Sequence, residues 1–144
     1  MIYHEIPKIP LQNFLCFDIG TKKTGIANNF AKNDISFAIE TINTENILSK
    51  IVEIQHNFEF QYIIIGLPTA YPESQSFHFI TKFVEFLQKN LPNMNFIFWD
   101  EDNSSNAIRQ AYKFGRKGFS KKFHNNYDMQ VAGLILQNFL AFHW

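Results

Sequence analysis

Cysteine is nearly absent from this sequence, and the one cysteine lies in an apolar stretch. Cys16 belongs to the run Phe-Leu-Cys-Phe over residues 14–17, where we expect a buried, inert thiol rather than a nucleophile or a redox centre. The chain has 144 residues, of which 46% are hydrophobic, and a chain of this size buries a core without disulfides or structural metals. Disulfide scaffolds and thiol chemistry are therefore not expected.

The sequence also lacks long hydrophobic runs and linker-like segments. No apolar stretch is long enough to cross a bilayer, and the first residues do not combine a basic region with a long apolar one, as a secretory signal does. No repeat, low-complexity tract or Pro/Gly-rich linker divides the chain. We therefore expect a single domain over residues 1–144 that resides in the cytoplasm and has no membrane partner.

An excess of charge of one sign is missing from the whole chain but present in one segment. The formal net charge is zero, whereas residues 109–124 hold six basic residues, four aromatic residues and no acidic residue. The basic residues are Arg109, Lys113, Arg116, Lys117, Lys121 and Lys122. Lysine and arginine neutralise phosphates, and aromatic rings stack on unpaired bases. We expect this segment to bind nucleic acid; the alternative is a solvated loop that its phenylalanines anchor to the core.

Hydrophobic patterns predict five strands. Residues 14–17, 24–27 and 36–42 are expected to form an antiparallel meander, with a turn at residues 20–23. Residues 61–66 and 95–99 are continuous apolar runs, typical of parallel strands that are covered on both faces. Three meander strands followed by strands that alternate with helices predict a mixed α/β sheet with helices on both faces.

Four helices are expected between and after these strands. Thr44 is a candidate cap of the first, and residues 72–74 open the second, which ends near residue 91. The third helix is predicted over residues 104–114 and the last over residues 126–142. The side chains expected to line the buried side of the second helix are Phe79, Phe83, Phe86 and Leu87.

Two acidic residues follow predicted strands. Asp18 ends the first strand, and Glu101 lies in the sequence Asp-Glu-Asp after the fifth. Ligands bind at the strand ends of α/β sheets, because the chain there leaves the packed layer. Each residue also has a structural interpretation, since Asp18 fits a turn and Glu101 fits a helix N-terminus.

A third acidic residue decides between these interpretations. Helical spacing places Asp128 in line with residues of the stripe that should face the core, namely Val131, Ala132, Ile135 and Phe139. A buried carboxylate needs a cation or a proton. Three converging carboxylates without a histidine or cysteine pattern favour Mg²⁺ or Mn²⁺ rather than zinc. Two such ions support phosphodiester hydrolysis, so we predict a metal-dependent nuclease with these three acids as metal ligands.

At these positions the sequence resembles the YqgF family. The resemblance rests on four successive blocks that cover nearly the whole chain, namely residues 17–27, 63–68, 100–101 and 128–137. It implies the ribonuclease-H-like fold of Holliday-junction resolvases and a nuclease that matures the 5′ end of pre-16S ribosomal RNA. It also places Asp18, Glu101 and Asp128 on the family's acidic triad. Lys23 falls on a basic position after the first strand, and we expect it and Lys22 to contact nucleic acid.

Two segments depart from the family pattern. Residues 102–105 read Asp-Asn-Ser-Ser where an arginine and two threonines are usual, and residues 69–74 replace an acid-glycine turn. Either change favours a weakened or redirected enzyme.

Other functions are weighed against this prediction. RNA precursors, in free form or within ribosomal precursor particles, are the expected partner, and a resolvase of branched DNA is the alternative. A further alternative is a non-catalytic RNA-binding or transcription-associated factor of the same fold. Sugar kinases and actin-like ATPases share the Asp-x-Gly-Thr turn, but they use two copies of the fold in a much longer chain.

Overall fold

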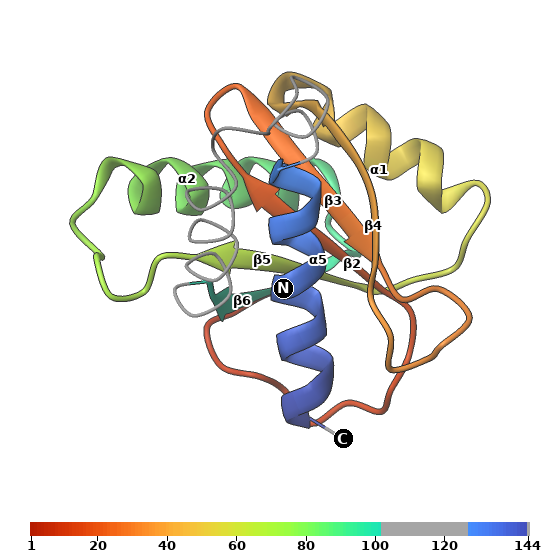
Figure 1. Cartoon of the computed structure of the whole chain (residues 1–144). Helices are drawn as coiled ribbons and strands as arrows, with labels where there is room; N and C mark the ends of the chain where they lie inside the picture. The colour runs from red at the N-terminus through yellow and green to blue at the C-terminus, as the bar shows by residue number, and fades with distance from the viewer. Residues whose placement is uncertain (102–126, 144) are drawn as a thin grey trace, which may run out of the picture.

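A six-stranded mixed sheet forms the centre of the fold (Figure 1). The computed structural model describes residues 1–101 and 127–143. The strands are β1 (Ile2–Tyr3), β2 (Phe14–Ile19), β3 (Lys23–Asn28), β4 (Phe37–Asn43), β5 (Tyr62–Leu67) and β6 (Asn95–Asp100), in the order β1-β6-β5-β2-β3-β4. β2, β3 and β4 are antiparallel, and β1, β6, β5 and β2 are parallel. The predicted meander followed by parallel strands is confirmed.

The prediction of five strands was one strand short. β1 pairs with β6 through Ile2–Phe96 and Tyr3–Ile97 only, and the Phe96 amide donates to the Met1 carbonyl at 2.8 Å. A strand of two residues shows no alternation of apolar and polar side chains, so its sequence carries no periodic signal.

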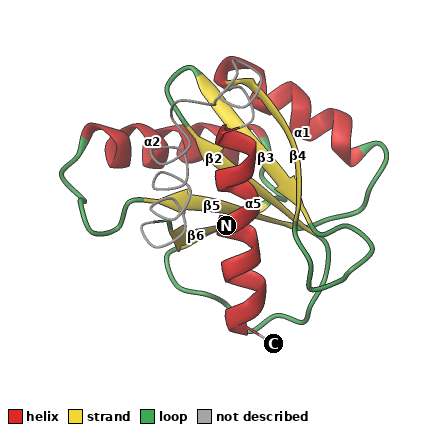
Figure 2. Cartoon of the chain, in the orientation of Figure 1, coloured by secondary structure: helices red, strands yellow, loops and turns green. Residues whose placement is uncertain are grey.

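Helices cover both faces of the sheet, as predicted (Figure 2). The elements are the 3₁₀ turn η1 (Thr44–Asn46), α1 (Ile47–Gln55), α2 (Gln75–Asn90) and α5 (Tyr127–His143). Residues of α1 and α2 share one buried core cluster with the sheet, and residues of α5 share the other. We refer to these as the α1/α2 face and the α5 face. None of the helices in the described part of the chain is long and apolar enough to span a membrane.

The second helix begins as predicted, and its buried stripe agrees with the prediction at Leu87 but not at Phe86. The Ser74 hydroxyl caps α2 by accepting a hydrogen bond from the Phe77 amide at 3.1 Å. The fully buried residues are Ile80, Val84 and Leu87, whereas Phe86 is 48% exposed. The predicted phenylalanine stripe was therefore wrong at Phe86, because the helix approaches the sheet through its smaller branched side chains. Phe79 and Phe83 are partly buried at its margin.

Thr44 has a different role from the predicted helix cap. Asn43 is the N-cap residue of η1, and it makes no side-chain cap bond. The buried Thr44 hydroxyl instead donates to the Gly20 carbonyl at 2.6 Å and lies 2.9 Å from the Thr24 hydroxyl. Thr44 therefore ties the end of β4 to the turn between β2 and β3. The predicted helix over residues 104–114 and the basic segment 109–124 lie outside the described residues.

Candidate functional site

The three predicted acidic residues come from three elements at one end of the sheet. Asp18 is near the end of β2, Glu101 directly follows β6, and Asp128 is in the first turn of α5. β2 and β6 run in the same direction, so their carboxyl ends share one edge. Asp18 lies two residues after Cys16, which belongs to the core cluster on the α5 face. Because strand side chains alternate, Asp18 also lies on that face.

Two glycines flank Asp18 in the neighbouring strands. Gly25 of β3 is its partner in the antiparallel pair. On the other side, Phe17 pairs with Ile65 of β5, so the next residue, Gly66, lies beside Asp18. Glycine is uncommon inside strands and marks places where another group approaches closely. Both neighbours of Asp18 in the adjacent strands therefore lack a side chain.

The space above Gly66 is occupied by Glu101. A Cβ atom at Gly66 would lie 3.2 Å from Glu101 Oε2 and 2.6 Å from Ile135 Cδ1 of α5. The Glu101 amide also donates to the Leu67 carbonyl at 3.2 Å. The Glu101 carboxylate thus folds back over β5 on the α5 face, toward the strand that carries Asp18.

The space above Gly25 is occupied by the start of α5. A Cβ atom at Gly25 would overlap the carbonyl oxygen of Asp128 and would lie 2.6 Å from the Met129 nitrogen. The first turn of the helix therefore rests directly on the β3 backbone. This contact brings Asp128 next to the residue that pairs with Asp18.

Burial makes Asp128 a weaker acid than a solvated aspartate. Its pKa is raised by desolvation, and the nearby charge of Lys23 opposes this effect. Its side chain is half-buried, while the four residues predicted to share its stripe are fully buried. The prediction that Asp128 lies on the core-facing side of the helix is confirmed.

Cys16 is fully buried, as the sequence predicts. The pKa of its thiol is raised well above the usual range, mainly by burial and further by the charge of Asp18. The effect of Asp18 on Cys16 agrees with their placement on the same face of β2.

The three carboxylates share a face and an edge but are not drawn together into one ligand set. Within residues 1–101 and 127–143, no group of three or more histidine, cysteine, aspartate or glutamate side chains is arranged to hold a metal ion. The donor chemistry of the three acids fits a hard divalent ion, because all their ligand atoms are oxygens. Three carboxylates also repel one another in the absence of a cation.

Lys22 and Lys23 lie at the same end of the sheet, in and after the turn between β2 and β3. Both side chains are exposed. The turn is closed by a hydrogen bond from the Gly20 amide to the Lys23 carbonyl at 2.9 Å, and the Thr44 amide donates to the Lys22 carbonyl at 2.9 Å. Lys23 Nζ donates to Asn43 Oδ1 at 2.7 Å. The other six basic residues predicted to bind nucleic acid, from Arg109 to Lys122, lie outside the described residues.

Sequence reasoning assigned no role to Gly25 and Gly66. The available signal was a glycine inside each of two predicted strands. The glycines alone did not show what approaches them, because that depends on how α5 and Glu101 pack against the sheet.

Comparison with known proteins places this geometry in context. The family described as "RuvX: Holliday junction resolvase" matches residues 12–141. A Phocaeicola vulgatus protein named "Putative pre-16S rRNA nuclease" is 30% identical over 135 residues, which are 90% of this chain and 96% of the relative. Proteins of the same name are 30% identical in Rickettsia conorii, covering 94% of this chain and 88% of the relative, and 25% identical in Fusobacterium nucleatum, covering 90% and 97%.

Proposed function

The chain belongs to the RuvX family, described as Holliday junction resolvase, and from this membership we propose that it is a nuclease that matures the 5′ end of pre-16S ribosomal RNA. One observation carries the choice of substrate. Relatives named for pre-16S rRNA match this chain over 90% or more of its length. The expected substrate is RNA, in free form or within ribosomal precursor particles in the cytoplasm.

We propose that Asp18, Glu101 and Asp128 together hold Mg²⁺ or Mn²⁺. The close approach of Glu101 to Gly66 and of Asp128 to Gly25 supports this assignment, because both glycines are neighbours of Asp18. A cation offsets the mutual repulsion of three carboxylates, so its binding draws them to ligand distance. When bound, two such ions supply an activated water and a stabilised leaving oxygen.

The chain's own residues prepare this site for a cation. Because burial raises the pKa of Asp128, its carboxylate is costly to ionise without a positive neighbour. Lys23 supplies part of that charge, and the proposed metal supplies the rest. Lys22 and Lys23 are exposed at the same end of the sheet, and we expect them to contact substrate phosphates.

The alternative function is cleavage of branched DNA, and it rests on the family description. A resolvase acts on a four-way junction, whereas a maturation nuclease acts on a single-stranded extension of an RNA. The same acidic residues would serve either reaction, so the two functions differ in substrate and not in chemistry.

The testing experiment compares two substrates. A 5′-extended 16S RNA precursor and a four-way DNA junction are incubated with Mg²⁺ or Mn²⁺ and with the wild type, Asp18→Asn or the control Asp34→Asn. Asp34 is exposed in the segment before β4. We expect RNA cleavage that Asp18→Asn reduces by at least about 100-fold and Asp34→Asn leaves unchanged.

Two results would change this conclusion. Preferential cleavage of the junction would replace the maturation nuclease with a resolvase. Binding of the precursor RNA without cleavage of either substrate would overturn the nuclease and favour a binding factor of the same fold.

A further inference from the structure

A pocket lies next to the candidate site, at the carboxyl ends of β5 and β6. It has a volume of about 530 Å³, within the range of roughly 300 to 1,000 Å³ that is typical of small-ligand sites. β1 covers only Phe96 and Ile97 of the β6 edge. Beyond Tyr3 the chain leaves that edge, and residues 4–6 form one wall of the pocket while the strand ends form another.

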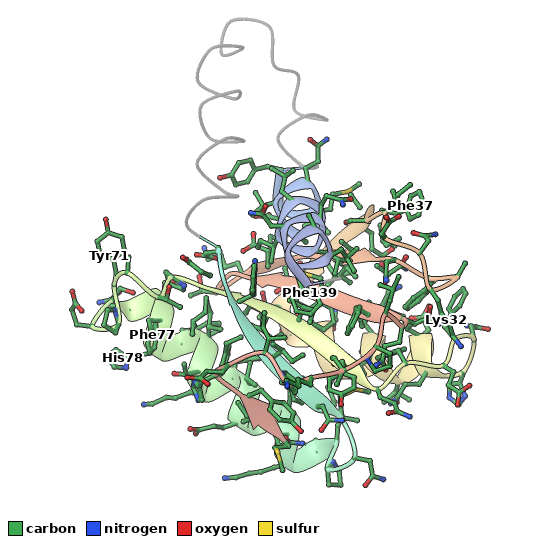
Figure 3. The ribbon with its side chains drawn as sticks, turned by 90° about the horizontal axis from the view of Figure 1, so that it is seen from below. Lys32, Phe37, Tyr71, Phe77, His78 and Phe139 are labelled. Carbon is green, nitrogen blue, oxygen red and sulfur yellow. The ribbon has the colours of Figure 1, made fainter. Side chains whose placement is uncertain are left out.

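Aromatic and apolar side chains make up most of the pocket wall. Phe77 comes from the first turn of α2, and Phe98 and Trp99 come from the end of β6. The exposed His4 ring packs on the Phe98 ring, with 5.0 Å between the centroids. Figure 3 shows Phe77 near the start of α2 and Tyr71 projecting outward from the loop between β5 and α2. Such a wall suits a flat aromatic ligand.

The polar groups among the described lining residues favour a base over a phosphate. Glu5 and Asp100 line it, together with Thr69. Lysine and arginine are not found among the described lining residues. Carboxylates repel phosphate but accept hydrogen bonds from amino groups on bases. The pocket therefore differs in charge from the lysine-bearing turn between β2 and β3.

The pocket and the candidate site lie at the same end of the sheet. Leu67 and Asp100 both line the pocket. Glu101 directly follows Asp100, and its amide donates to the Leu67 carbonyl at 3.2 Å. Glu101 itself does not line the pocket: its carboxylate lies on the α5 face, whereas Leu67 and Phe98 of the pocket wall belong to the core cluster of the α1/α2 face. A group in the pocket therefore lies near the candidate site, across the ends of β5 and β6 from that carboxylate.

We propose that this pocket receives one unpaired nucleobase of the RNA substrate, from a nucleotide near the bond that is cut. This inference rests on the proposed nuclease function and adds a base-reading site to it. The base stacks against the His4 and Phe98 side, and its amino group faces the carboxylate of Glu5. Adenine, cytosine and guanine carry such an amino group and are preferred over uracil, whose carbonyl oxygens face the same carboxylate unfavourably.

The first test measures binding without catalysis. The chain has two tryptophans, Trp99 and Trp144, so a Trp144→Phe protein reports on Trp99 at the pocket wall. It is titrated, without divalent metal, with pentaribonucleotides of adenosine or uridine and with a pentamer of abasic sugars. We expect the adenosine pentamer to quench Trp99 fluorescence, the uridine pentamer to bind more weakly, and the abasic pentamer to give no quenching.

A matched pair of variants assigns the binding to the pocket. His4→Ala removes an exposed pocket ring, and His56→Ala removes an exposed histidine that follows α1 and does not line the pocket. We expect His4→Ala to weaken binding of the adenosine pentamer about tenfold. His56→Ala should stay within about twofold of the parent, as a surface substitution outside the site.

The second test uses cleavage of a precursor RNA in which single bases near the cut are replaced one at a time by abasic sugars. With the wild type, we expect one position where the replacement lowers kcat/KM about tenfold. With His4→Ala, the same replacement should cause little further loss.

The outcomes separate this inference from the function on which it rests. RNA cleavage that no abasic replacement slows, together with quenching that does not depend on the base, would overturn the base pocket. The proposed nuclease function would then still stand. Base-dependent quenching that His4→Ala weakens, without cleavage of any RNA, would support the pocket and contradict the nuclease. Equal quenching by all three pentamers would also overturn the pocket, because it would show binding without base recognition.

Discussion

The two faces of the sheet carry different residues at the same level along the strands. On the α1/α2 face, Phe17 and Ile65 are neighbours and are fully buried in an apolar cluster. One residue further on, the α5 face presents Asp18 beside Gly66 and Gly25. The first face contributes the larger apolar cluster. The α5 face has less side-chain packing at the end of the sheet where the three acidic residues lie.

This difference explains how one small sheet combines stability with a charged site. Ionisable groups are costly in an apolar layer, so they are placed at the end of the sheet where α5 begins. The glycines let backbone and carboxylate groups lie close to the strands. Substitutions that fill this space should therefore affect activity more than stability.

Filling the space above Gly25 should have the largest effect. In Gly25→Ala the new methyl group overlaps the Asp128 carbonyl, which is backbone and cannot rotate away. We expect a loss of about 3 kcal/mol in the free energy of unfolding, measured in urea, and loss of detectable RNA cleavage.

Gly133→Ala is the matched control for Gly25→Ala. Its Cβ would lie 3.5 Å from Ala38 Cβ and 3.8 Å from Ala38 N and Ser36 Oγ, which are ordinary contacts. Alanine is also favoured over glycine inside a helix by about 0.5 to 1 kcal/mol. This variant should be as stable as the wild type or more so, and active. Equal effects of the two substitutions would contradict the special role of Gly25.

Gly66→Ala should separate activity from stability. The new methyl group meets Ile135 Cδ1, the end of a flexible side chain, and Glu101 Oε2. We expect a loss of about 1 kcal/mol in stability and a loss of at least about tenfold in kcat, because Glu101 is displaced.

The double variant Gly66→Ala/Ile135→Val tests that separation, because valine lacks the Cδ1 atom. Its loss in the free energy of unfolding should be smaller than the sum of the losses in the two single variants. Its kcat should nevertheless stay low. Recovery of kcat would show that Ile135, and not Glu101, accounts for the effect.

Asp128→Asn should stabilise the protein while it abolishes cleavage. Because the pKa of Asp128 is raised in the folded state, the folded state holds this proton more tightly than the unfolded state. Stability is therefore lost as pH rises from the ordinary aspartate pKa through the raised value. The metal-free asparagine variant should lack this loss and melt at a higher temperature at neutral pH than the wild type. A lower melting temperature would contradict the burial cost assigned to Asp128.

Lys23→Gln should have the smallest effect, a shift of the pH dependence. The Lys23 charge lowers the pKa of Asp128, so removing it raises that pKa further. Activity requires the ionised carboxylate, so its acidic limb should move to higher pH. Lys22→Gln serves as the control, because Lys22 is not among the groups that shift the pKa of Asp128. An equal shift in both variants would indicate a general effect of net charge.

The positions of the acidic residues could be predicted from the sequence, because they depend on local patterns. Asp18 lies near the end of the apolar strand β2, Glu101 directly follows β6, and Asp128 lies in phase with a helical stripe that is buried as predicted. The antiparallel meander followed by parallel strands was predicted from the same kind of pattern, as was the buried stripe of α5. Each of these features depends on the residue pattern of a single helix or strand.

The missed features depend on contacts between distant elements. Gly25 and Gly66 matter because α5 and Glu101 pack directly against them. Residues 2–3 form β1 only because they pair with the edge of β6. Thr44 bonds across the fold to Gly20 instead of capping its own helix. In α2, four phenylalanines and three branched apolar residues could face the sheet, and the geometry of packing against the sheet decides which of them are buried.

Whether the three carboxylates form one cation site is tested most directly by titration with Mn²⁺, with binding monitored by the relaxation of water protons. The proteins compared are the wild type, Asp18→Asn, Glu101→Gln, Asp128→Asn and Asp34→Asn. We expect each of the first three substitutions to weaken Mn²⁺ binding by at least about tenfold, whereas Asp34→Asn should bind Mn²⁺ as the wild type does. Equal Mn²⁺ affinity in all five proteins would show that the three carboxylates do not form one cation site, and it would contradict the account.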